Sequence, residues 1–122
     1  MGKHRLLIGS ELHYEDAKAG ITLGIPELVY SSAYYSLYAL VRYLLEEQGV
    51  FVKENSDVQQ AGQKYLKFLS LEDWDNYNLI KVNREQADYT ARENWQYINS
   101  LLSPKDLFSI YCDLYFKLQR EV

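Results

Sequence analysis

The stretch from Pro26 to Gln48 constrains the fold more than any other part of the chain, because nothing in it interrupts a helix. Pro26 suits a first helical position, where its missing N–H would be unpaired anyway, and Gly49 is placed to act as a left-handed C-cap. At 100° per residue, one face is apolar and the opposite face carries small residues that let a second helix approach closely. The apolar face comprises Tyr30, Ala33, Tyr34, Leu37, Val41 and Leu44, and the opposite face Ser32, Ser36, Ala39 and Tyr43. Only Glu46 and Glu47 are expected to be solvated, so the pattern predicts a helix in the middle of a bundle.

The composition is that of a soluble globular protein with one domain over residues 1–122, since 48% of residues are hydrophobic and 25% are charged. A net charge of −4 argues against attraction of nucleic acid by the overall field, so RNA is not expected as a partner. Cys112 is the only cysteine, which excludes an internal disulfide and suits a reducing cytoplasm. No stretch reaches the length of a membrane span. We therefore expect a cytoplasmic protein with no membrane partner.

Shorter helices are expected on both sides of this stretch. Residues 4–19 predict a first helix, joined to Pro26 by a connection short enough to imply an antiparallel neighbour. Ser56 and Gln59 have the spacing of a capping box, which predicts a helix over residues 57–68. Ser70 and Asp73 repeat that spacing at the start of a further helical segment. This segment either continues toward Leu102 or breaks after Tyr89, and a break is favoured.

The last helix has the clearest start in the sequence. Ser103 is a good N-cap, Pro104 follows at the first helical position, and Asp106 suits the positive end of the helix dipole. Its apolar residues cover more than half of the circumference: Leu107, Phe108, Ile110, Tyr111, Cys112, Leu114, Tyr115, Phe116 and Leu118. The predicted fold class is all-α, an antiparallel four-helix bundle with an additional short helix. The apolar surface left over on this helix and on the small-residue face of the central one predicts a homodimer.

Several polar residues are candidates for function. Tyr35, Tyr38 and Arg42 share one edge of the central helix and could stack on and clamp a flat anionic ligand such as a nucleotide. They could equally be bundle packing. Lys53 and Asn55 lie at a junction between loop and helix, where free N–H groups favour anions, although a solvated lysine and a capping asparagine explain them as well.

Arg84 and Asp88 are placed at i and i+4, where they can pair, with Arg84 on an otherwise apolar face. The arginine is either the inward half of a satisfied ion pair or a cation that faces a ligand. His4 and His13 point in opposite directions on the first helix, so they are interpreted as surface or cap residues. No metal site and no cofactor is expected.

The combination of these segments resembles the HEPN (higher-eukaryote and prokaryote nucleotide-binding) family. The resemblance rests on SSAYYSLYALVRYLLEEQG at 31–49, on VKENSDV at 52–58 and on REQADY at 84–89. It implies a small HEPN-like helical bundle, often dimeric, whose members commonly bind a nucleotide or partner a minimal nucleotidyltransferase. The candidate ligand residues are Tyr35, Tyr38, Arg42, Lys53, Asn55, Arg84 and Asp88.

Other members of the family are ribonuclease toxins, recognised by an arginine followed after four to six residues by a histidine. This chain departs from that pattern, because Arg5 and His13 are too far apart and no histidine follows any other arginine. Asn55 stands where the related Lys-Thr-His segment has its histidine. The resemblance therefore favours a non-catalytic HEPN-type bundle, and the alternative is a ribonuclease toxin of a toxin–antitoxin pair that uses other residues.

Overall fold

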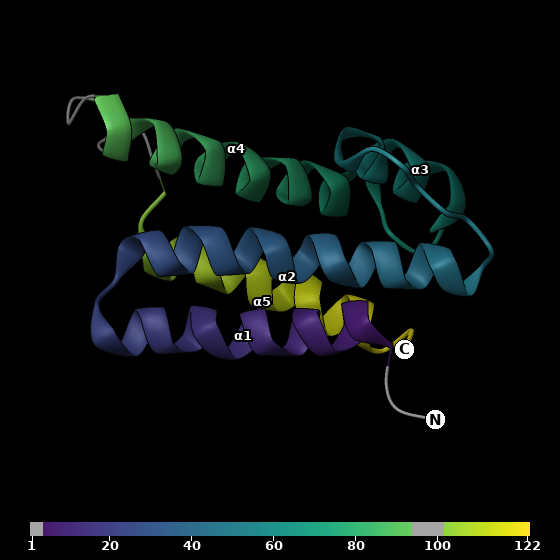
Figure 1. The fold of residues 1–122 in the computed structure, drawn as a ribbon, viewed down its shortest axis with the longest axis horizontal. Coiled ribbons are helices and arrows are strands. Elements are labelled where there is room, and N and C mark those ends of the chain that lie inside the picture. Colours follow the sequence, from purple (N-terminus) through teal and green to yellow (C-terminus); the bar gives the residue numbers. More distant parts are fainter. Residues whose placement is uncertain (1–3, 94–101) are drawn as a thin grey trace.

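The chain folds into five α-helices and one 3₁₀ turn in a computed structural model that describes the backbone of residues 4–93 and 102–122, and the side chains of 4–88 and 102–122. The elements are α1 (Arg5–Leu23), α2 (Pro26–Glu47), the 3₁₀ turn η1 (Asn55–Asp57), α3 (Val58–Tyr65), α4 (Leu71–Glu93) and α5 (Pro104–Gln119). The long helices α1, α2, α4 and α5 run in alternating directions along the chain, and α3 lies near the C-terminal end of α2 (Figure 1). The described residues contain no strand, which confirms the all-α class.

Helix α2 is central, because it contacts every other α-helix of the described chain. All six residues of its predicted apolar face are buried: Tyr30, Ala33, Tyr34, Leu37, Val41 and Leu44. Both predicted ends also hold, since Pro26 begins the helix and Gly49 follows it with a positive φ of 80°. Local signals placed this helix correctly because the apolar period and the capping residues agree.

The small-residue face of α2 packs against α1 within the same chain. Ser36 lies at the centre of this contact, donating to the Ser10 carbonyl at 2.9 Å and accepting from the Tyr111 hydroxyl at 2.6 Å. Gly20 allows the close approach, since a Cβ there would lie 2.8 Å from a methyl group of Val29. Ser32, Ser36 and Ala39 of this face are buried within the chain itself, and Tyr43 is partly buried.

The first and third helices differ from the prediction. Helix α1 continues past residue 19 to Leu23, because Gly20 is used for close packing and Gly24 (φ 69°) is the left-handed residue at the end. The predicted helix over 57–68 is shorter, covering only Val58–Tyr65. Ser56 lies inside the preceding 3₁₀ turn and not at a helix N-cap, so the Ser56–Gln59 capping box is wrong.

Helix α4 begins as predicted and does not break where a break was expected. Ser70 and Asp73 form a capping box in both directions, with N–H···O distances of 2.9 and 3.1 Å. The helix then continues through Tyr89 to Glu93, because its polar segment contains neither glycine nor proline. The predicted extension toward Leu102 lies largely outside the described residues.

Helix α5 follows its predicted start, with the Ser103 hydroxyl accepting from the Asp106 N–H at 3.1 Å. Five of its apolar residues are buried: Leu107, Tyr111, Leu114, Tyr115 and Leu118. Three more are partly buried against the core, Phe108, Ile110 and Cys112, whereas Phe116 remains 46% exposed. Less apolar surface is therefore left over on α5 than its composition suggested.

Candidate functional site

An open pocket of about 260 Å³ lies between α2, η1 and α4. Its lining combines aromatic rings with polar and charged groups: Tyr34, Tyr35, Tyr38, Asn55, Ser56, Lys81, Arg84 and Glu85. Four of the seven predicted ligand residues are among them, and they come from three separate elements. The other three, Arg42, Lys53 and Asp88, are not part of the lining.

Arg84 lines the pocket, and its side chain is only 26% exposed. Its Nη2 donates to the Tyr35 hydroxyl at 2.6 Å, and its Nε lies 3.1 Å from a carboxylate oxygen of Asp88. The guanidinium carbon is 5.5 Å from the ring centroid of Tyr34 and 5.0 Å from that of Tyr35. The predicted Arg84–Asp88 ion pair is thus present, and the same arginine also faces the pocket.

Tyr34 also lines the pocket and packs against Arg84 and Tyr35. Its pKa is raised chiefly by burial, with the nearby Arg84 charge opposing part of that effect. Its ring lies within 6.3 Å of the rings of Tyr35, Tyr38 and Tyr77. Edge-to-face and tilted ring contacts of this kind stabilise an aromatic cluster, and three of its rings, Tyr34, Tyr35 and Tyr38, line the pocket.

Tyr38 and Asn55 close the other side of the pocket. The Tyr38 hydroxyl donates to Oδ1 of Asn55, which joins α2 to η1 across 17 positions of sequence. The loop after α2 therefore folds back along the helix. Because Oδ1 accepts this bond, the Asn55 amide N–H groups remain able to donate toward a ligand.

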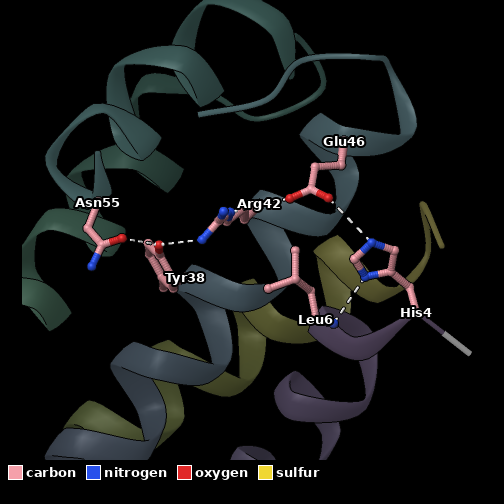
Figure 2. Close-up of polar contacts among 6 residues, drawn as sticks. All are labelled: His4, Leu6, Tyr38, Arg42, Glu46 and Asn55. Carbon is pink, nitrogen blue, oxygen red and sulfur yellow. Dashed lines mark hydrogen bonds and ion pairs between the residues drawn. The ribbon is translucent and has the colours of Figure 1, made fainter. Parts of the chain in front are cut away.

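A relay of polar side chains supports Tyr38 from behind (Figure 2). Arg42 Nη1 donates to the Tyr38 hydroxyl at 3.1 Å, and its Nε lies 3.3 Å from a carboxylate oxygen of Glu46. The other Glu46 oxygen lies 3.3 Å from Nε2 of His4. His4 Nδ1 in turn accepts from the Leu6 N–H at 3.1 Å and caps α1. The relay thus connects the start of α1 to the pocket wall.

This relay changes the interpretation of two residues. Glu46 was expected to be solvated, but its side chain is only 16% exposed because it joins two cationic or imidazole groups. Arg42 was expected to hold a phosphate, yet its guanidinium is engaged by Glu46 and Tyr38 and does not line the pocket. The geometry makes Arg42 a positioning residue for the Tyr38 hydroxyl.

Lys53 is exposed and does not reach the pocket, whereas Lys81 and Glu85 line it and were missed by sequence reasoning. Both are on α4 on either side of Arg84, four residues apart, so helical spacing alone could have placed them together. Neither makes an ion pair within the described residues. The lining thus carries Lys81, Arg84 and Glu85, and Asp88 pairs with Arg84 beside it, so the two positive and two negative groups balance.

The position of His13 also differs from its interpretation as a surface or cap residue. Its imidazole centroid lies 5.9 Å from that of Tyr35, whose hydroxyl binds Arg84. Its Nδ1 is buried without a hydrogen-bond partner in the described part of the chain. His13 does not line the pocket itself, but it packs directly behind one of the residues that do.

Within residues 4–93 and 102–122, no group of three or more His, Cys, Asp or Glu side chains is arranged to hold a metal ion. None of the helices described is long and apolar enough to cross a bilayer. No family model, no curated protein and no solved structure matches this chain.

Proposed function

We propose that this protein is a non-catalytic HEPN-type helical bundle that binds a nucleotide in the pocket between α2, η1 and α4. The observation that carries the proposal is the meeting of Tyr35, Tyr38, Asn55 and Arg84 around one cavity, since these residues come from all three segments of the resemblance. Phenol rings offer stacking surface, and an amide and a guanidinium offer hydrogen-bond donors to a base, sugar or phosphate.

The size and charge of the pocket favour a mononucleotide over a triphosphate. A volume of about 260 Å³ lies just below the ~300–1,000 Å³ typical of pockets for drug-sized ligands. The balanced charge of the site gives little attraction for a polyphosphate, because Arg84 is partly neutralised by Asp88 and the carboxylate of Glu85 lines the same pocket. A base with its ribose and at most one phosphate fits both properties.

The test is a calorimetric titration of the protein with adenosine, AMP, GMP and ATP. We expect AMP or GMP to bind more tightly than ATP. Asn55→Ala should weaken binding about threefold to tenfold, the effect of losing one hydrogen bond. Asn78→Ala is the matched control, because Asn78 is an exposed amide on α4 outside the pocket. An absence of binding at millimolar nucleotide would remove the nucleotide from the proposal.

We further propose partnership with a minimal nucleotidyltransferase, with the resemblance as its support. The test is co-purification of this chain with a nucleotidyltransferase encoded beside it. Self-association stays a prediction of the sequence, and sedimentation velocity at micromolar concentration tests it. A single monomeric species would contradict it.

The position of His13 favours one second candidate, a ribonuclease. Histidine is the usual general acid or base in RNA cleavage, and His13 packs against Tyr35, whose hydroxyl accepts from Arg84. The non-catalytic proposal predicts that purified protein leaves single-stranded RNA intact. Cleavage that is abolished by both His13→Ala and Arg84→Met would replace it with the ribonuclease.

A further inference from the structure

A second concave surface lies on the other side of the bundle, between α1 and α5. This groove has a volume of about 570 Å³ and is independent of the nucleotide pocket. It is lined by Glu11, Leu12, Tyr14, Glu15, Tyr115, Phe116 and Gln119. Leu12 and Phe116 are 62% and 46% exposed, although both are large apolar side chains. Exposed apolar surface framed by charged groups is typical of an interaction site.

The aromatic residues of the groove form one rigid cluster. The rings of Tyr14 and Tyr115 stack at a centroid distance of 4.7 Å with only 3° between their planes. Phe116 stands across both rings, at 74° to Tyr14 and 76° to Tyr115. Rings held in this way keep their faces and edges in fixed positions, so a partner meets a preformed surface.

A cation of the chain itself, Lys18, contacts two residues of the groove lining without being part of that lining. The Lys18 ammonium lies 5.3 Å from the centroid of Tyr14 and 3.8 Å from a carboxylate oxygen of Glu15. Lys18 and Glu15 are 50% and 65% exposed, so the lysine is loosely held and can be displaced. The pKa of the Tyr115 phenol is raised chiefly by burial and further by Glu11 and Glu15 among other groups, while its hydrogen bond with Gln119 opposes part of this effect.

We propose that this groove binds a partner protein segment that carries an arginine or lysine beside an aliphatic side chain. The cation takes the place of Lys18 over the Tyr14 ring near Glu15, and the aliphatic side chain packs on Leu12 and Phe116. Attraction between a cation and an aromatic face, strengthened by a neighbouring carboxylate, supplies the selectivity. A second copy of this chain is the competing occupant, and the oligomeric state of the groove variants tests it.

The experiment selects binders for the full chain from a displayed random peptide library and measures the affinity of enriched peptides by fluorescence polarisation. We expect enriched peptides to share an arginine or lysine next to a leucine, isoleucine or methionine. Glu15→Lys and Phe116→Ala should each weaken their binding about tenfold or more. Glu47→Lys is the matched control, since Glu47 is an exposed carboxylate away from the groove and the substitution changes the net charge equally.

Lys18→Met should strengthen peptide binding, in contrast to the groove variants. The substitution removes the Lys18 ammonium from the Tyr14 ring but keeps an apolar side chain, so peptide affinity should rise about twofold to fivefold. Circular dichroism confirms that each variant keeps its helices. The inference is overturned if no peptide is enriched, if enriched peptides lack a cation, or if the groove variants bind as well as Glu47→Lys. It is also overturned if Phe116→Ala converts a dimer to a monomer, which would assign the groove to a second copy.

Discussion

Asp88→Asn should tighten the binding of a phosphorylated nucleotide while leaving the binding of its nucleoside unchanged. The Asp88 carboxylate lies 3.1 Å from Arg84 Nε and cancels part of the positive charge that faces the pocket. The amide keeps the size of the side chain and removes its charge. Arg84 still donates to Tyr35, so the wall of the pocket should keep its shape.

The size of the effect follows from the distance between the two anions. A phosphate bound beside Arg84 would lie about 6 Å from the Asp88 carboxylate, where two unit charges repel by ~0.7 kcal/mol in water and ~3 kcal/mol at a dielectric constant of ~20. Asp88 is 47% exposed, so the lower part of that range applies. We expect a gain of about 1 kcal/mol, which is roughly a fivefold tighter Kd for AMP.

The assay is a calorimetric titration of wild type and Asp88→Asn with AMP and with adenosine, at low and at high salt. Asp75→Asn serves as the control, because Asp75 is an exposed carboxylate on the same helix outside the pocket. The gain for AMP should shrink at high salt, since exposed charges are screened. An equal change for adenosine and AMP, or none for either, would refute the placement of a phosphate beside Arg84.

Arg42→Met should weaken the binding of adenosine and of AMP equally, about threefold, because Arg42 positions Tyr38 and holds no phosphate. A loss of affinity confined to AMP in the same titration would contradict this. The free energy of unfolding should fall as the pH drops below about 4, where Asp73 becomes protonated and loses its bonds to Lys117 and Ser70. Burial tends to raise the pKa of Asp73, but these bonds lower it overall, so the carboxylate stabilises the fold above that pH. Urea titrations across that pH range measure the change. Lys117→Met should lower the free energy of unfolding by about 1 kcal/mol at neutral pH, since Lys117 is 38% exposed and its ion pair with Asp73 is partly screened. The same substitution should flatten the pH dependence of stability. An unchanged slope in the same titrations would show that other carboxylates dominate.

The sequence predicted those elements whose signals are local. The start of α5 at Ser103 and Pro104, the capping box at Ser70 and the apolar face of α2 each depend on residues within a few positions of one another. The errors occurred where a distant residue decides the outcome. From the local sequence alone, Gly20 indicates the end of a helix. In the structure it lies inside α1, because Val29 of the next helix packs on it.

In the candidate site, too, local contacts were predictable from the sequence and contacts between distant segments were not. The Arg84–Asp88 pair was predictable from its spacing of four residues on one helix. The bond from Tyr38 to Asn55 was not, because it depends on how the loop after α2 folds back. His13 was also unpredictable, since its approach to Tyr35 depends on the packing of α1 against α2.

The contrast between the two arginines identifies the group that should control phosphate binding. Arg42 and Arg84 each have a carboxylate four residues later, Glu46 and Asp88, so helical spacing alone makes both arginines partly neutralised. Only Arg84 lines the pocket, because Tyr35 holds it there, whereas Tyr38 holds Arg42 behind the wall. Lys81 is the cation of the lining that has no ion-pair partner within the described residues. A phosphate that enters this site should therefore depend on Lys81 for its net attraction, and on Arg84 mainly for orientation.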